Sequence, residues 1–380
     1  MPRLRDLGIE NGRLSPGPHN AITDVPGVAV GHATLIQGDG AWTGGGPLRT
    51  GVTLILPHVG NLYADKVTAA VHTINGFGKV AGFEQVRELG TIETPIALTS
   101  TLNVPRVADA LITLAIEQNP HIGIGFAELG RPGYASVNPV VGETSDGFLS
   151  DIQARAVGEA EVRAALRDAS TGPVAEGVVG AGTGTSCYGW KGGIGTAGRV
   201  LPQAQGGFTV GALVQSNFGS PLELTMVGVP VGEQLQPPDY RPRPEAGSIM
   251  IVLATDAPLN THQLGRLCKR AAFGLARTGS TCHGGSGDFV IAFSTTRRVP
   301  DRPKQLVVQE NVLFEQNIMS SFALAVIESV EEAIYNSLLM AHTVVGRDGN
   351  TRYGLPADEV TAIVQRASHR KVNDGQEANE

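Results

Sequence analysis

The feature that most restricts the fold is an almost continuous apolar run at residues 248–254, Ser-Ile-Met-Ile-Val-Leu-Ala. A strand with one face in water alternates apolar and polar residues, whereas an unbroken apolar run is typical of a strand buried on both faces. Residues 289–293, Phe-Val-Ile-Ala-Phe, show the same pattern. The sequence therefore predicts a sheet in the interior of the molecule, as at the centre of a sandwich.

Helical periodicity lies on both sides of that run, because apolar residues recur at the three- and four-residue steps that place them on one helical face. The predicted helices are residues 79–89, 104–118, 159–167, 259–277, 317–342 and 358–367. Further strands are predicted at residues 28–30, 52–56, 207–215 and 222–227. Strands followed by pairs of helices, on both sides of a proline-rich connector, fit a four-layer αββα sandwich better than a doubly wound parallel sheet.

Composition narrows the class of function. Hydrophobic residues make up 41% and charged residues 17% of the chain, as in a folded globular protein. A net charge of -7, with no run of Lys or Arg longer than two, argues against a nucleic-acid partner. Three cysteines fit a reducing compartment better than a disulfide framework. Residues 1–10 lack an apolar stretch and no apolar run is long enough to span a membrane, so we expect a cytoplasmic protein.

Ser248 lies directly before the buried strand, after Gly247 and the proline-rich connector at residues 234–245. Most Gly-Ser pairs are only turns, so this position alone carries little weight. If the Gly247–Ser248 bond were cut, Ser248 would carry its own base, because a free α-amino group has a pKa of about 7.7–8.0 and accepts a proton near neutral pH. Ser248 is thus a candidate N-terminal nucleophile.

The same hydroxyl could make the cut. Attack of Ser248 Oγ on the Gly247 carbonyl would turn the amide into an ester, and water would then release the new terminus. Gly247 suits this step because it has no Cβ and leaves an open face for the attack. The connector before it is predicted to be exposed, so that it can move away afterwards.

A second polar segment, residues 281–288 (Thr-Cys-His-Gly-Gly-Ser-Gly-Asp), comes just before the strand at 289–293. If this strand pairs with the one that begins at Ser248, Ser286 and Asp288 would lie near the Ser248 amine and hydroxyl and could orient them. The pattern alone favours a simpler interpretation, a glycine-rich hairpin with an Asx-type turn.

Six motifs in order resemble the DmpA/BapA family, the L-aminopeptidase/D-esterases and β-peptidyl aminopeptidases. The likeness extends from about residue 7 to residue 345. The motifs are residues 22–27 (Ile-Thr-Asp-Val-Pro-Gly), 30–32 (Val-Gly-His), 192–195 (Gly-Gly-Ile-Gly), 214–219 (Val-Gln-Ser-Asn-Phe-Gly), 247–248 (Gly-Ser) and 285–288 (Gly-Ser-Gly-Asp). Each motif is short, but their combination and order are specific.

The resemblance implies a sandwich like that of the Ntn hydrolases with DmpA-type connectivity, formed by residues 1–380 as a single catalytic domain. It implies autocleavage into an α chain, residues 1–247, and a β chain, residues 248–380. It further implies that four such pairs assemble into a homo-oligomer. The expected substrates are small peptides, amides or esters with a free N-terminal amine, and no cofactor is expected.

The resemblance also assigns roles to site residues. Ser248 matches the nucleophile, Ser286 the second serine, and Asp288 the acidic residue two positions on, which is glutamate in β-peptidyl members. Asn217 matches the asparagine that donates to the oxyanion, where a preorganised donor stabilises the developing charge. Taken by itself, Asn217 could equally cap a turn at the end of a strand.

Glu143, within residues 140–147, matches the glutamate that binds the substrate's free ammonium. A buried carboxylate there would explain a requirement for a free amine, because a blocked substrate would leave its charge unpaired. By pattern alone Glu143 could be a solvent-facing loop residue. Some members have a tyrosine two residues later as a second oxyanion donor, where this chain has Ser145.

Other classes of function fit less well. The glycines at residues 180–184 could cradle a phosphate, but no lysine follows at P-loop spacing. Cys282 and His283 could indicate a cysteine hydrolase, but neighbours on an extended segment point to opposite faces. The nine histidines show no paired spacing for a metal. An acyltransferase like ornithine acetyltransferase and a catalytically silent binding homologue remain alternatives.

Overall fold

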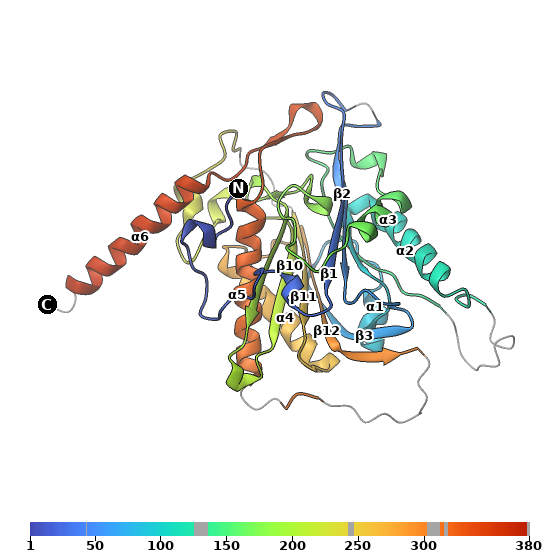
Figure 1. The fold of residues 1–380 in the computed structure, drawn as a ribbon. Helices are drawn as coiled ribbons and strands as arrows, with labels where there is room; N and C mark the ends of the chain where they lie inside the picture. Colours follow the sequence, from blue (N-terminus) through green and yellow to red (C-terminus); the bar gives the residue numbers. More distant parts are fainter. Residues whose placement is uncertain (43, 125–135, 242–246, 302–311, 315–317, 378–380) are drawn as a thin grey trace.

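The computed structural model describes residues 1–42, 44–124, 136–241, 247–301, 312–314 and 318–377. Two sheets are stacked between two pairs of helices, and Figure 1 shows the layers in order. The first layer contains α4 (Thr261–Arg277) and α5 (Ile318–Leu339), and the last contains α2 (Val104–Gln118) and α3 (Glu159–Asp168). The predicted four-layer αββα sandwich is confirmed.

The larger sheet has six strands in the order β4-β3-β12-β11-β10-β9. In its centre, β11 (Gly247–Thr255) runs parallel to β12 (Ser286–Pro300) and antiparallel to β10 (Thr209–Asn217). The outer strands are β3 (Asp65–Gly76), β4 (Thr91–Ile92) and β9 (Ile194–Val200). The smaller sheet has the order β1-β2-β5-β6 and consists of β1 (Ala29–Gln37), β2 (Leu48–Leu56), β5 (Ile96–Ser100) and β6 (Val140–Thr144).

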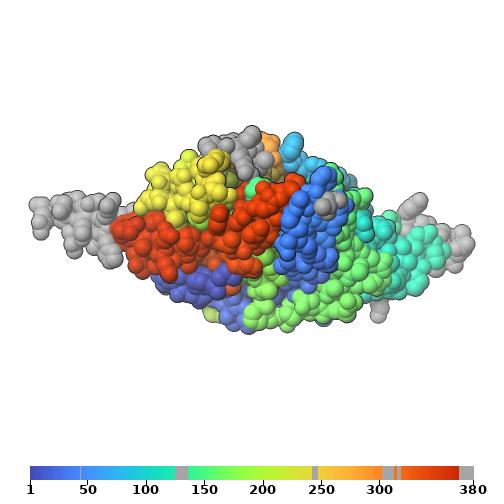
Figure 2. Space-filling view, turned by 90° about the horizontal axis from the view of Figure 1, so that it is seen from above, coloured from blue at the N-terminus to red at the C-terminus, as the bar shows by residue number. Residues whose placement is uncertain are grey.

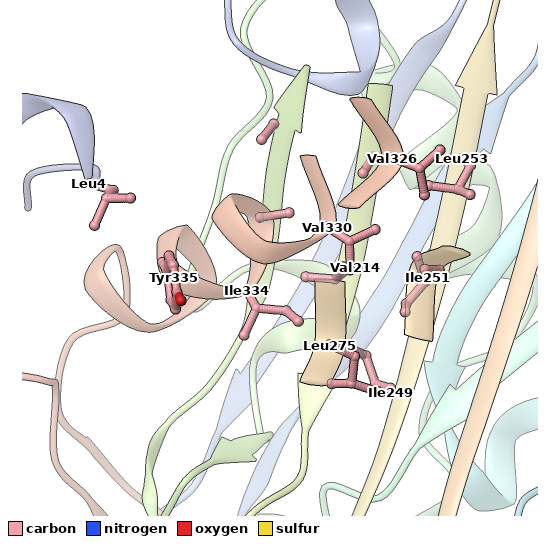
Figure 3. Close-up of a cluster of buried hydrophobic side chains, with 14 of the residues drawn as sticks. Leu4, Val214, Ile249, Ile251, Leu253, Leu275, Val326, Val330, Ile334 and Tyr335 are labelled. Atoms are coloured by element: carbon pink, nitrogen blue, oxygen red, sulfur yellow. The ribbon is translucent and has the colours of Figure 1, made fainter. Parts of the chain in front are cut away.

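The side chains of β11 alternate between two hydrophobic layers. Ile249, Ile251 and Leu253 pack against the helices α4 and α5, as Figure 3 shows. Met250 and Val252 face the smaller sheet, whose inward residues complete a second apolar layer. A third layer joins the outer face of the smaller sheet to α2 and α3. The apolar run at 248–254 is therefore unbroken because both faces of its strand are buried, as predicted.

Smaller elements surround the sandwich. They are α1 (Phe83–Leu89), α6 (Ala357–Glu377) and two hairpins, β7 (Ser186–Cys187) with β8 (Trp190–Lys191) and β13 (Val344–Val345) with β14 (Thr351–Arg352). The hairpin β13-β14 belongs to the C-terminal segment, shown in red in Figure 2, which lies beside the blue segment that contains β1 and β2. A hydrogen bond of 2.8 Å from Asp348 N to Gly40 O joins the two segments.

Three predicted elements differ from those observed. Helix α1 begins only at Phe83, because Gly82 before it has a left-handed φ of +83°. The strand predicted at 222–227 is wrong: this stretch begins with a short 3-10 turn, Pro221–Glu223, and then forms a bridge between Met226 and Val229. The last helix continues beyond residue 367 to Glu377. Of the predicted connector, residues 242–245 lie outside the described part of the chain.

None of the described helices is long and apolar enough to cross a membrane.

Candidate active site

Three neighbouring strands bring the predicted site residues together. Asn217 at the end of β10 lies opposite Ser248 at the start of β11. On the other side of β11, Gly247 lies opposite Ser286, and Ile249 lies opposite Asp288. The pairing that the sequence left conditional therefore exists, and it places Asn217 and Asp288, 71 positions apart in the sequence, on the two strands that flank β11.

A cavity of about 610 Å³ opens at this edge of the larger sheet. Four of the predicted residues line it, namely Glu143, Asn217, Gly247 and Ser248. Its wall also has apolar side chains, among them Phe77 and Phe148. Ser286 and Asp288 are not part of this lining: they are almost fully buried, with 3% and 1% of their surface exposed. They lie inside the sheet on the strand beside Ser248, and not in the cavity wall.

Ser248 directs its hydroxyl at the preceding peptide. Its Oγ donates a hydrogen bond to the Gly247 carbonyl oxygen, so the hydroxyl lies beside the carbonyl group that it would have to attack. Gly247 is tightly enclosed, because a Cβ there would lie 2.7 Å from Phe218 Cα and 2.9 Å from the Asn217 carbonyl oxygen. Only glycine fits at this position without moving the strand beside it.

Asn217 is oriented by a backbone group. Its Oδ1 accepts a hydrogen bond of 2.8 Å from the N–H of Ser186, on the hairpin β7-β8. Because the amide oxygen is used in this way, the NH₂ group is left as the donor that faces the cavity. An amide donor held in place beside a serine hydroxyl is suited to stabilise an oxyanion that forms next to that hydroxyl.

Glu143 lies at the end of β6 with 2% of its surface exposed. One carboxylate oxygen accepts a 2.8 Å hydrogen bond from the backbone N–H of Lys79, and the other accepts the hydroxyl of Thr101. A buried carboxylate that faces a cavity needs a cation to balance its charge, since desolvating an unpaired charge is costly. The site is therefore suited to a substrate ammonium group. The alternative of a solvent-facing loop glutamate is wrong.

Ser286 and Asp288 form a pair behind Ser248. The Ser286 hydroxyl donates a 2.6 Å hydrogen bond to Asp288 Oδ1. Burial raises the pKa of Asp288, although the hydrogen bonds from Ser286 and from the Ile249 N–H act in the opposite direction. Asn75 of β3 fixes the turn before them by donating to the carbonyl oxygens of His283 and Ser286. The alternative interpretation of this segment as a glycine-rich hairpin is wrong, because residues 281–285 join helix α4 to β12 and not two strands.

Sequence reasoning missed several groups at the cavity. His283, considered in the sequence only as a partner of Cys282, lines the cavity and contacts Glu223 at 2.9 Å. The N–H groups of Ser186 and Lys79 were missed because backbone donors leave no residue signature, and the Thr101 hydroxyl was missed because nothing in the sequence places it beside Glu143. Cys282 packs against the apolar core and burial raises the pKa of its thiol, which disfavours a thiolate nucleophile.

Two further observations concern Ser145, which lies in the cavity wall, and groups of side chains that could bind a metal ion. Ser145 lines the cavity, and its Oγ accepts a 3.3 Å hydrogen bond from the N–H of Gly147. Within the described ranges, no group of three His, Cys, Asp or Glu side chains is placed to hold a metal ion. The described lining of the cavity includes the Ser248 hydroxyl, the Asn217 amide, the Glu143 carboxylate and the His283 imidazole.

Comparison with known proteins identifies the family of the chain. The model of peptidase family S58 matches residues 20–352. The beta-peptidyl aminopeptidase BapA of Sphingosinicella xenopeptidilytica is 39% identical over an alignment of 385 positions, which covers 97% of this chain and 92% of BapA.

Two solved structures have the same fold over nearly the whole chain. The PH0078 protein from Pyrococcus horikoshii superposes with a TM-score of 0.89 and 46% identity, covering 97% of this chain and 99% of that one. The L-aminopeptidase D-Ala-esterase/amidase from Ochrobactrum anthropi, described as a prototype for the serine aminopeptidases and a new variant among the Ntn hydrolase fold, superposes with a TM-score of 0.87 and 37% identity, with coverage of 97% and 99%. The chain therefore belongs to peptidase family S58, as a serine aminopeptidase with this variant of the Ntn-hydrolase fold.

Proposed function

We propose that this aminopeptidase processes itself at Gly247–Ser248 and then uses Ser248 as an N-terminal nucleophile. The observation that supports this most directly is the hydrogen bond from Ser248 Oγ to the Gly247 carbonyl, at a cavity that also contains Asn217 and Glu143. A hydroxyl beside its own preceding carbonyl is placed for attack on that carbonyl. Cleavage would divide the single catalytic domain into residues 1–247 and 248–380.

Self-cleavage would proceed in two steps. Ser248 Oγ forms a bond to the Gly247 carbonyl carbon, the C–N bond breaks, and the hydroxyl proton passes to the leaving amine. The resulting ester joins Gly247 to Ser248 Oγ, and water hydrolyses it to a free Gly247 carboxylate and a free Ser248 hydroxyl. In this proposal the Asn217 amide stabilises the oxyanion in both steps, and its hydrogen bond from Ser186 N–H supports that role.

The mature enzyme would repeat this chemistry on its substrate. The free α-amino group of Ser248 takes the Oγ proton as Oγ attacks, and later gives it to the leaving amine or alcohol. Glu143 binds the substrate's ammonium group, which fixes the scissile carbonyl beside Ser248. Asp288, held by Ser286, stabilises the ammonium form of the Ser248 terminus that arises during the attack.

The substrates proposed for this site are small peptides, amides or esters with a free amine. The cavity volume of about 610 Å³ lies in the range of sites for small molecules. A cavity of this size is too small to take up a folded protein. BapA is named as a β-peptidyl aminopeptidase and the Ochrobactrum enzyme as an L-aminopeptidase and D-Ala-esterase/amidase. We propose β-peptides, L-amino-acid amides and D-alanine esters or amides as candidate substrates of this chain. We further propose that four cleaved pairs assemble into one homo-oligomer.

The test is the intact mass of purified protein. Wild type is expected to give two fragments, residues 1–247 and 248–380, whereas Ser248→Ala remains one chain. Ser320→Ala, at an exposed position of α5, should be cut like wild type. The purified wild type should also hydrolyse alanine p-nitroanilide or a β-homoamino amide to the free acid. An uncut chain with full activity would refute the proposal, and transfer of the acyl group to an amine instead of water would favour an acyltransferase.

A further inference from the structure

The hydrogen bond that orients Asn217 is connected, through one peptide group, to a buried lysine to which no role has been assigned above. Lys191, at the end of the β7-β8 hairpin, has no exposed surface. We infer that Lys191 positions and polarises the Asn217 amide through the single peptide group between Thr185 and Ser186. This inference rests on the proposed role of Asn217 as oxyanion donor, and it assigns Lys191 as a positioning residue for the same reaction.

The Lys191 ammonium is enclosed by backbone oxygens. Its Nζ donates to the carbonyls of Gly182 at 2.9 Å, Thr185 at 2.8 Å and Gly192 at 2.6 Å. An ammonium has three N–H donors, so these three acceptors match the protonated form. Burial lowers the pKa of Lys191 to about 7, and the nearby Asp146 acts in the opposite direction. None of these contacts is with a carboxylate, so the ion is positioned by peptide dipoles.

One of the three carbonyls belongs to the peptide group that holds Asn217. The Thr185 oxygen accepts from Lys191, and the N–H of the same peptide group, that of Ser186, donates to Asn217 Oδ1 at 2.8 Å. A trans peptide is planar and its C=O and N–H point in opposite directions. Fixing the oxygen at Lys191 therefore fixes the direction of the N–H toward Asn217.

The same contact also strengthens the donor. A cation bonded to a carbonyl oxygen draws electron density from the peptide and makes its N–H a better donor, and chains of hydrogen bonds polarise one another in this way. The polarised Ser186 N–H then acts on Asn217 Oδ1, and so makes the Asn217 NH₂ group a better donor to an oxyanion. Thr185 O also accepts the Gly192 N–H at 3.2 Å, so the peptide would stay in place, less firmly, without the lysine.

The experiment is a double-mutant cycle with Lys191→Met and Asn217→Ala, in which kcat is expressed per cleaved chain after incubation long enough for the slower self-cleavage expected of Asn217→Ala. Methionine has a similar length and no donor. Lys191→Met alone is expected to lower kcat by about 10-fold, less than the roughly 100-fold or greater loss that follows removal of an oxyanion donor. KM should remain within about twofold of wild type, because Glu143 anchors the ammonium independently.

In the Asn217→Ala background, Lys191→Met should cause no further loss of kcat, because its effect passes through Asn217. An equal fold loss in both backgrounds would show that Lys191 only holds the fold together, and would overturn the inference. Lys269→Met, at an exposed position of α4, is the matched control and should match wild type.

Two results keep this inference separate from the proposed function. If Ser248→Ala retains activity, the proposed nucleophile itself is wrong. If Ser248→Ala is inactive but the cycle is additive, only the role of Lys191 fails. Should Lys191→Met not fold, Lys191→Arg replaces it: its planar fork cannot meet three converging carbonyls, so kcat should fall in the wild-type background and not in Asn217→Ala.

Discussion

At the scale of single residues, two acidic side chains at this site have different surroundings. Glu143 receives two hydrogen bonds and borders the cavity, whereas Asp288 lies inside the sheet on the strand beside Ser248 and has its pKa raised by burial. Environments that separate two carboxyl groups in this way also separate their roles. We therefore expect Glu143 to select the substrate and Asp288 to act on the Ser248 amine.

Replacing Glu143 with Gln tests the first of these roles. The amide keeps the size of the carboxyl group but loses the charge that pairs with the substrate ammonium. We expect kcat/KM for alanine p-nitroanilide to fall about 10-fold to 100-fold, which corresponds to the roughly 1.5–3 kcal/mol of a hydrogen bond to a charged group. Glu84→Gln, at an exposed position of α1, should leave kcat/KM unchanged, and equal values for both variants would exclude the anchoring role.

The enclosure of Gly247 leads to a second prediction. Gly247→Ala would force its Cβ against Phe218 and Asn217, and so displace the carbonyl from the Ser248 hydroxyl. Cleavage should slow by at least tenfold or stop, as a time course on a denaturing gel would show. Gly284→Ala is a close control, because a Cβ there meets nothing within 4 Å. Normal cleavage of Gly247→Ala would mean that this geometry does not govern the reaction.

The sequence indicates the candidate site residues better than the groups that orient them. The family resemblance assigns roles to five side chains that the structure brings together around one edge of the larger sheet, namely Ser248, Asn217, Glu143, Ser286 and Asp288. Their partners include backbone groups whose positions depend on the register of strands far apart in the sequence. Register of this kind is set by packing of the whole sheet, which a residue pattern does not record.

At the scale of elements, α5 is buried on nearly all sides and still carries acidic residues. Glu328 and Glu332 contact the fully buried Arg199 of β9, at 3.2 Å and 2.5 Å. Arg5, from the N-terminal segment, contacts Glu332 at 3.0 Å. The carboxylates therefore join the N-terminal segment, the helix and the edge strand of the larger sheet.

Arg199→Met should destabilise the protein strongly. The substitution leaves two buried carboxylates without their shared cation, and loss of one partner of a buried pair costs about 3–5 kcal/mol of the free energy of unfolding. Arg163→Met removes an exposed pairing with Glu117 and Glu159 and should change stability little. Urea unfolding of uncut Ser248→Ala carrying each substitution measures both, and similar midpoints for the two would contradict this account.

Most elements could be predicted because their periodicity is long. Helices 104–118 and 159–167 and the strand at 248–254 agree closely with α2, α3 and β11. Residues 222–227 were wrongly predicted as a strand from their alternating apolar residues. Leu224 and Met226 are apolar because they are buried in the core beside a turn, and they do not belong to a sheet. An alternating pattern over so few residues records burial, and burial alone does not distinguish a strand from a packed loop.

At the scale of the whole molecule, the proposed cleavage divides the larger sheet between two chains that remain interleaved. Strands β11 and β12 lie after the scissile bond, and they are flanked by β3 on one side and β10 on the other, both before it. Each chain therefore completes the hydrogen bonding of the other. The two hydrophobic layers that contact β11 also take residues from both sides of the bond.

The two fragments should consequently stay together after the cut. On native size exclusion they should elute as one species at the position of uncut Ser248→Ala, and they should separate only in denaturant, because separation exposes both strand edges and both apolar layers. Free fragments under native conditions would contradict the interleaved sheet. The same column measures the proposed assembly of four pairs, which predicts a mass about four times that of the 39.6 kDa chain.

The bond that we propose is cut joins the first two residues of the interior strand β11. Its cleavage would therefore report that the protein has folded. Ser248, the Gly247 carbonyl and Asn217 come together only when β10, β11 and β12 have paired in register. A chain that misfolds or is still folding would keep the bond intact. The proportion of cut to uncut chain on a denaturing gel of crude cell extract would then count correctly folded molecules, with no substrate and no purification.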